Sequence, residues 1–179
     1  MPSVNPNNNV PNNETLATVA LQTAQGQLGQ SEKPMGSNTG PMVNEYLHAV
    51  GLNPGYAWCQ AFVYWCYQVA SKKLNIVNPV VRTGGVHDCW NRSTTGATLT
   101  KLPIADVLQH PGIVRPGDQF ILSFSGNAGH TGIVEKVDRG VIYTIEGNSN
   151  TNGSREGYEV VRHQRNLNDK SLVGFIHYS

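Results

Sequence analysis

The sequence has 179 residues, of which 39% are apolar and 14% charged, which is typical of one domain that buries its own core without disulfides or a structural metal. Thirteen Lys and Arg residues are scattered among twelve Asp and Glu residues, so the basic face of a nucleic-acid-binding protein is missing and no nucleic-acid partner is expected. No run approaches the roughly 18 apolar residues of a membrane span, and the first residues lack the basic start and apolar core of a classical signal peptide.

The first thirteen residues differ in composition from the rest of the chain. Residues 1–13 contain six Asn and three Pro with almost nothing to bury, which predicts a flexible leader. Residues 14–179 are then expected to form the single folded domain, and the protein is expected to be a monomer.

Two amphipathic helices are predicted early in this domain. Apolar and small residues keep helical spacing from Leu16 to Leu28, and Gly29 is placed to end that helix. Pro41 is a favourable first-turn residue for a second helix, which Gly51 would end.

A third helix is predicted after the turn at residues 53–55. The apolar run over residues 58–70 is too long for a typical strand, and at helical spacing it places one continuous apolar face toward the core. This helix begins at or just before Cys59. Residues 76–101 mix Pro, Gly, Thr and Asn, which predicts a long irregular excursion with one short helix over residues 86–91.

Short β-branched and aromatic runs follow from Arg115 onward, and each is typical of a strand. The runs cover residues 119–124, 130–137, 141–145, 158–164 and 172–178. Residues 138–140, Asp-Arg-Gly, form a hairpin turn between the second and third of them. Helices followed by antiparallel strands predict an α+β fold, with N-terminal helices packed on a C-terminal antiparallel sheet of about five strands.

Cys59 is the candidate nucleophile. Unpaired N–H groups and the macrodipole at a helix N-terminus favour a thiolate, and the turn before Cys59 leaves the first turn of the helix accessible. For Cys66 the preferred interpretation is an ordinary buried thiol. A bridge between Cys66 and Cys89 is left open, because three cysteines cannot all pair within one chain.

His130 is the candidate base. An imidazole can hold a neighbouring thiol ionised and later protonate a leaving amine. The sequence Gly129-His130-Thr131-Gly132 places this side chain at the start of a strand, with glycines that let the backbone approach closely. The other histidines fall on a helix surface, in loops or within later strands: His48, His87, His110, His163 and His177.

Glu146 and Asn148 are the candidates for the group that orients the His130 imidazole. Pairing across the predicted hairpin brings the start of one strand beside the end of the next. Counting outward from Arg139, His130 is nine residues back, Glu146 seven forward and Asn148 nine forward, so either can reach the imidazole. The two share a sheet face because they are two residues apart. The alternative for Glu146 is a solvated carboxylate at a strand end.

Four segments in order resemble the CHAP family of cysteine, histidine-dependent amidohydrolases and peptidases. They are residues 58–65 (WCQAFVYW), 115–118 (RPGD), 129–134 (GHTGIV) and 146–148 (EGN). Residues 37–43 and 50–52 also resemble phage-like cell-wall hydrolases of that family. The resemblance implies a papain-like fold, a Cys and His pair with a Glu, Asp or Asn orienter, and cleavage of peptidoglycan as an N-acetylmuramoyl-L-alanine amidase or a stem or cross-bridge endopeptidase.

Substrate contacts are expected around the start of the third helix. The backbone N–H of Cys59 is placed to meet the oxyanion, and Asn53, six residues earlier, is a candidate second donor on reach alone. Tyr56 or Trp58 is expected to line the substrate groove, although an aromatic beside a nucleophile is more often a core residue.

No cofactor or metal is expected, because the acidic calcium loop of some phage members of the family is missing. The expected partner is peptidoglycan or its peptides, reached after lysis, by injection or as part of a virion. Two other functions stay open, a transferase or deamidase acting on another amide and a non-catalytic module that binds glycopeptide. A zinc site built from His87, Cys89 and Cys59 is a further alternative, although the His-x-Cys pair lacks a spaced partner pair.

Overall fold

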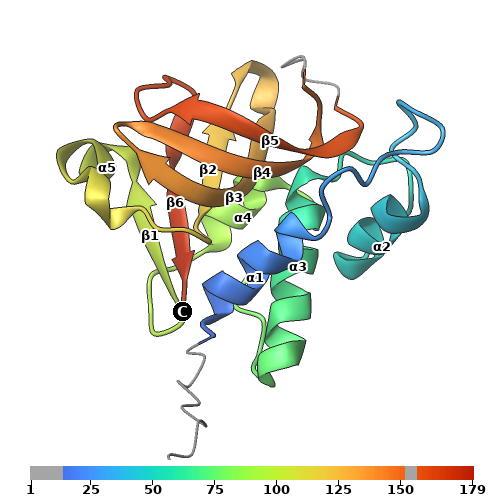
Figure 1. Ribbon diagram of the computed structural model, residues 1–179, viewed down its shortest axis with the longest axis horizontal. Helices are drawn as coiled ribbons and strands as arrows, with labels where there is room; N and C mark the ends of the chain where they lie inside the picture. Colours follow the sequence, from blue (N-terminus) through green and yellow to red (C-terminus); the bar gives the residue numbers. More distant parts are fainter. Residues whose placement is uncertain (1–13, 152–156) are drawn as a thin grey trace, which may run out of the picture.

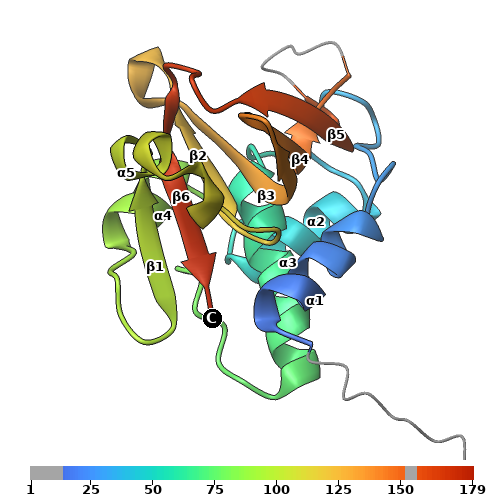
Figure 2. The same ribbon diagram turned by 60° about the vertical axis from the view of Figure 1, so that its left-hand side comes forward.

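The computed structural model describes residues 14–151 and 157–179 of the chain. Within these residues it has five α-helices and one six-stranded antiparallel sheet, and the α+β prediction is confirmed. Figures 1 and 2 show the N-terminal helices together beside one face of a curved sheet. The predicted leader at residues 1–13 lies outside the described residues.

The helices form where the sequence predicts them, with one addition. They are α1 (Leu16–Gln25), α2 (Pro41–Ala49), α3 (Cys59–Leu74), α4 (Val86–Arg92) and α5 (Ile104–Gln109). None of the helices in the described part of the chain is both long enough and apolar enough to cross a membrane.

Helix α1 ends earlier than predicted. The hydroxyl of Thr15 accepts the N–H of Thr18 and caps the helix start, but the helix stops at Gly26 instead of Gly29. The N–H of Gly29 donates to the carbonyl of Val160, over 3.0 Å. A tertiary hydrogen bond to a strand therefore replaces the last turn of the predicted helix.

The sheet has six strands, one more than predicted. The strands are β1 (Leu99–Pro103), β2 (Gln119–Ser123), β3 (Gly129–Asp138), β4 (Val141–Ser149), β5 (Glu159–Asn166) and β6 (Leu172–Tyr178). Their order is β1-β6-β2-β3-β4-β5, and each neighbouring pair is antiparallel.

Strand β1 and helix α5 are the elements that the sequence pattern did not indicate. β1 lies at the sheet edge, where it pairs with β6 alone, and most of its residues are only partly buried. An edge strand of this kind tolerates a Pro such as Pro103 at its end. Its weak alternation explains why the sequence pattern did not predict a strand here.

The hairpin of β3 and β4 contains a bulge that sets the register near the candidate site. The turn at residues 139–140 has positive φ at both positions, 46° and 80°, as a two-residue hairpin turn requires. Next to this turn Asp138 lies opposite Val141, whereas Ile133 lies opposite Ile145. The bulge between these two pairs shifts the register by one residue.

Two apolar clusters cover the two faces of the sheet. The helix-side core includes Phe62 of α3 and Ile133 of β3, and α1, α2 and α3 cover it (Figure 2). The outer core includes Phe120, Val134 and Val107, the last of them from α5. Because successive residues of a strand alternate between faces, His130 projects from the same face of β3 as Val134.

Candidate active site

Cys59 is the first residue of α3, as the sequence predicts. The N–H of Phe62 donates to the carbonyl of Trp58 over 2.8 Å, so this is the first hydrogen bond of the helix. The N–H groups before it, including that of Cys59, have no acceptor within the helix. The Cys59 residue is 7% exposed and belongs to the helix-side core, so the candidate nucleophile is almost fully buried.

His130 is the second residue of β3 and contacts the candidate nucleophile. Its Nε2 lies 2.7 Å from Oε2 of Glu146, which leaves Nδ1 for the Cys59 thiol on the other side of the ring. Burial alone would lower the pKa of His130, but hydrogen bonds with the side chains of Cys59 and Glu146 raise it to about 9. The imidazole is therefore set up to carry a proton at neutral pH, although its side chain is only 16% exposed.

Glu146 is a fully buried carboxylate with three side-chain partners. Its Oε1 accepts from Thr144 Oγ1 over 2.6 Å and from Arg165 Nε over 2.7 Å, and its Oε2 accepts from Arg165 Nη2 over 2.6 Å. Burial would raise the pKa of this carboxyl, but the hydrogen bonds from Arg165 and His130 hold it well below its usual range. A buried charge of this kind is stable only when it is paired and hydrogen-bonded.

Sequence patterns did not reveal Arg165 or Thr144. On the neighbouring strand Val161 lies opposite Glu146, whereas Arg165 lies opposite Ile142. The long Arg165 side chain therefore reaches along the sheet to the carboxylate. The only signal in the sequence was the even spacing that puts Thr144 on the face of Glu146.

Two glycines make the close approaches that assemble the site. A Cβ on Gly132 would lie 2.9 Å from Cγ of Glu146, and a Cβ on Gly147 would lie 2.7 Å from Cζ3 of Trp58 and 2.8 Å from Cβ of Phe62. Gly132 therefore leaves room for the carboxylate beside β3. Gly147 lets β4 pack directly against the first turn of α3, which brings the thiol to the strand ends.

Asn148 has partners other than the imidazole that it was expected to orient. Its Oδ1 accepts the backbone N–H of Trp58 over 3.0 Å, and its Nδ2 donates to the carbonyl of Gly157 over 3.3 Å. The residue has a φ of 55°, in the left-handed region that Asn adopts more readily than most residues. The amide therefore ties the end of β4 to the residue before Cys59.

Buried hydrogen bonds fix the residues on both sides of Cys59. Trp58 Nε1 donates to Oε1 of Glu32 over 2.9 Å, and Gln119 Nε2 donates to Oε1 of Gln60 over 2.7 Å. Because Trp58 is fully buried, the expectation that it lines a substrate groove is wrong. Its ring belongs to the helix-side core, as the general tendency of aromatics beside a nucleophile suggested.

The other two predicted substrate contacts lie at the surface. Tyr56 is 57% exposed, and Asn53 is exposed in the loop before α3. Both side chains are thus accessible to a ligand, on the segment that leads into Cys59.

The remaining cysteines are buried free thiols. Cys66 and Cys89 are both fully buried and neither is in a disulfide, so the bridge left open by the sequence is not formed. Burial raises the pKa of both thiols. Among residues 14–151 and 157–179 no three His, Cys, Asp or Glu side chains gather as a metal site requires, so the zinc alternative with His87 has no geometric support.

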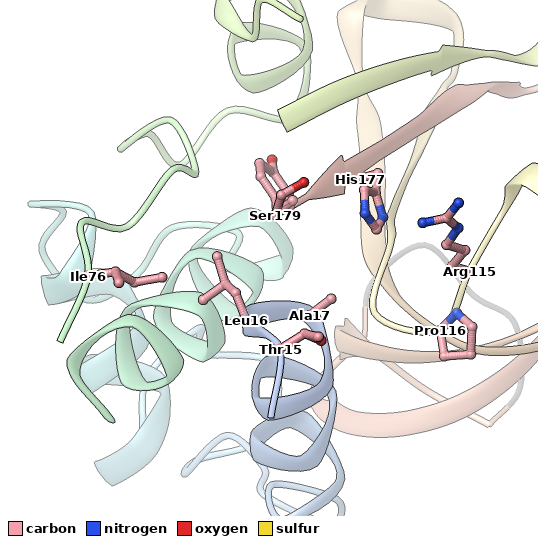
Figure 3. A pocket seen from close by; sticks show the side chains of 9 residues that line it. Thr15, Leu16, Ala17, Ile76, Arg115, Pro116, His177 and Ser179 are labelled. Carbon is pink, nitrogen blue, oxygen red and sulfur yellow. The ribbon is translucent and has the colours of Figure 1, made fainter. Parts of the chain in front are cut away.

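A pocket of about 440 Å³ lies away from this site, where the start of α1, the end of β6 and the Arg115-Pro116 segment meet (Figure 3). Its lining residues are Thr15, Leu16, Ala17, Ile76, Arg115, Pro116, His177, Tyr178 and Ser179. None of them is a predicted catalytic residue. This pocket is therefore separate from the candidate active site at the start of α3.

A family model described as the CHAP domain matches residues 51–148. The matched segment is more than half of the chain and contains the cysteine, histidine, glutamate and asparagine discussed above. No curated protein sequence matches the chain.

Solved structures with a similar fold include an endolysin and the protein Ly7917. The wild-type endolysin LysIME-EF1 has a TM-score of 0.56 at 17% identity, over 90% of this chain and 63% of that chain. Ly7917 has a TM-score of 0.50 at 19% identity, over 92% of this chain and 62% of that chain. Ly7917 with "the hydrolyzing product of MDP" gives 0.51 at 19% identity, over 90% and 62%. The chain thus spans less than two thirds of these proteins, and at this identity the likeness shows the fold alone.

Proposed function

The chain belongs to the CHAP family, and on that premise we propose that it is a peptidoglycan hydrolase that cleaves an amide bond through Cys59, His130 and Glu146. The observation that carries the proposal is the line of contacts from thiol to imidazole to buried carboxylate. Sets of nucleophile, base and orienter work through this arrangement. One of the similar structures is an endolysin, which favours a cell-wall substrate.

The reaction would begin with attack of the Cys59 thiolate on the amide carbonyl carbon. As the carbon–sulfur bond forms, the carbonyl electron pair moves onto oxygen and gives a tetrahedral intermediate. The His130 imidazolium then gives its proton to the amide nitrogen, the carbon–nitrogen bond breaks, and the amine leaves. The product bound to the enzyme is a thioester on Cys59.

Hydrolysis of the thioester would restore the enzyme. His130, now neutral, takes a proton from water, and the resulting hydroxide attacks the thioester carbon. Collapse of this second intermediate breaks the carbon–sulfur bond and releases the acid. The thiolate and the imidazolium are then ready for the next cycle.

Glu146 would keep the imidazole in one orientation throughout the cycle. Its carboxylate holds Nε2 over 2.7 Å, so Nδ1 stays directed to the sulfur and to the leaving group. Because the charge of Glu146 also favours the imidazolium, the proton donor is present before the substrate binds.

The oxyanion would be stabilised by the backbone N–H of Cys59, which is free at the helix start. Asn53 remains the proposed second donor, and Tyr56 the proposed contact for the glycopeptide. We also propose that the chain acts as a monomer, without a cofactor or nucleic acid, on wall material reached after lysis, by injection or from a virion.

Mass spectrometry of digested sacculi tests this function. A new free amine on the first residue of the stem peptide would identify an N-acetylmuramoyl-L-alanine amidase, and one inside the stem or bridge would identify an endopeptidase. A digest without any new amine contradicts the proposal and favours a glycopeptide-binding module or an acyl transferase.

A further inference from the structure

We propose that Arg165 is a positioning residue that fixes the Glu146 carboxylate and, through it, the His130 imidazole. The inference rests on the proposed function and extends its site from three side chains to four. Arg165 touches neither the thiol nor the imidazole in any hydrogen bond of the structure's described residues, so its effect must pass through Glu146.

The contacts of Arg165 hold the plane of the carboxylate. Its Nε and Nη2 bind Oε1 and Oε2 of Glu146 over 2.7 and 2.6 Å, a bidentate geometry that two parallel donors define. Thr144 occupies a second position on Oε1 over 2.6 Å. His130 Nε2 takes the remaining direction on Oε2, so the imidazole has one place to bind.

The guanidinium is itself held in place. Its central carbon lies 5.4 Å from the centre of the Phe120 ring, within the range of a cation–π contact. The Phe120 ring also lies 6.2 Å from the His130 ring. One aromatic side chain of the outer core thus lies beside two of the three partners of Glu146, Arg165 and His130.

The positive charge of Arg165 also keeps the buried Glu146 carboxylate ionised. Glu146 has no exposure to solvent, and burial without a cation favours the protonated carboxylic acid. The charged and titratable groups around it are Arg165 on β5, His130 on β3, Cys59 through His130, and Asp169, which acts on Arg165 from the turn after β5. Arg165 is the one permanently charged cation that contacts Glu146 within the described residues, so it keeps the carboxylate ionised.

Loss of Arg165 therefore weakens the Cys59–His130 pair in two ways. The carboxylate is free to turn away from Nε2, and it takes up a proton at a higher pH. Both changes remove support from the imidazolium, and with it from the thiolate that the imidazolium stabilises.

The rate at which iodoacetamide alkylates Cys59 as a function of pH tests this without any substrate. Cys66 and Cys89 are fully buried, and peptide mass spectrometry assigns the label. In Arg165→Gln we expect the midpoint of the alkylation profile to rise by about one pH unit, and the rate at any pH well below both midpoints to fall about tenfold. Arg165→Lys keeps the positive charge but loses the two parallel N–H donors of the guanidinium. The midpoint of its alkylation profile should therefore rise by less than that of Arg165→Gln.

Arg162→Gln is the matched control. Arg162 lies on the same strand and makes a bidentate pair with Glu135 on β3, over 2.8 and 2.9 Å, but that pair is exposed and away from the site. Its alkylation profile should equal that of the wild type. If Arg165→Gln does not fold, Arg165→Lys decides by the same midpoint.

An unchanged or lowered midpoint in the Arg165 variants would overturn the inference, because a merely structural arginine changes the melting temperature and not the profile. The alkylation result does not depend on the substrate, because iodoacetamide reacts with Cys59 directly. A wild type that releases no wall product while the midpoints shift as expected would sink the proposed function and keep the role of Arg165. If the wild type releases wall product but the midpoints of the Arg165 variants do not shift, the proposed function stands and the role of Arg165 is lost.

Discussion

The side-chain oxygen of Asn148 accepts a hydrogen bond from the backbone N–H of Trp58, the residue before Cys59, over 3.0 Å. The bond joins the end of β4 to the start of α3, ninety residues away in the sequence. The position of the thiol relative to the strand that carries Glu146 thus depends on a backbone contact as well as on the side chains that react.

Asn148→Ala should lower both stability and activity. The substitution leaves the N–H of Trp58 without its partner and places Ala at a φ of 55°, which together cost about 1–3 kcal/mol of the free energy of unfolding. Urea denaturation measures this, and release of soluble muropeptides measures the activity. Asn148→Asp keeps an acceptor for Trp58 and should retain most of the stability; an equal loss in both variants would mean that the acceptor is unimportant.

Gly147→Ala should push the first turn of α3 away from the sheet. The added Cβ would lie 2.7 Å from Cζ3 of Trp58 and 2.8 Å from Cβ of Phe62, and overpacking of this kind costs about 1–3 kcal/mol. Thermal denaturation and alkylation of Cys59 report on the fold and the site. Gly112→Ala, where an added Cβ meets nothing within 4 Å, is the control; a wild-type melting temperature in Gly147→Ala would show that the close approach has no role.

The pH dependence of kcat/KM should show an alkaline limb near the raised pKa of His130, about 9. The imidazolium that protonates the leaving amine is present below this value and is lost as the pH rises through it. Because Glu146 helps to raise the pKa of His130, Glu146→Gln should move the limb to lower pH and reduce kcat more than Asn148→Ala does. A limb that stays in place in Glu146→Gln would assign the orienting role to another residue.

Stability should depend on the same group. The pKa of His130 rises from 6.5 to about 9 on folding, so protonation favours the folded state. This contribution is present in full below pH 6.5 and is lost as the pH rises to about 9. Urea denaturation at a series of pH values should show the decline in the wild type and a smaller one in His130→Gln. Equal slopes would mean that the proton on His130 does not favour folding.

The sequence predicted those parts of the fold that local patterns define. Helical spacing placed the start of α3 at Cys59, and the Asp-Arg-Gly segment gave the β3–β4 turn. Edge strand β1 was missed because half-buried positions do not alternate clearly. The predicted end of α1 was wrong because it depends on a hydrogen bond from Gly29 to Val160. The residues of the helix alone do not indicate this contact with a distant strand.

The candidate site was also predictable only in part, because some of its contacts join residues that no local pattern links. Cys59 and His130 stand at the starts of α3 and β3, and hairpin pairing brings Glu146 of β4 beside them. Arg165 reaches Glu146 from a position four residues along the next strand from Val161, the direct partner of Glu146, and side-chain reach of that kind cannot be counted from a hairpin. The same limit applies to Trp58, whose buried ring donates a hydrogen bond to Glu32, far away in the sequence.

The most direct test of the account is the release of soluble muropeptides from purified sacculi by the wild type and by Cys59→Ala. Cys66→Ala is the control, since that thiol is fully buried and free. We expect the wild type and Cys66→Ala, if folded, to release product, and Cys59→Ala to fall to the level of sacculi without protein. Equal release by wild type and Cys59→Ala would contradict the assignment of Cys59 as the nucleophile.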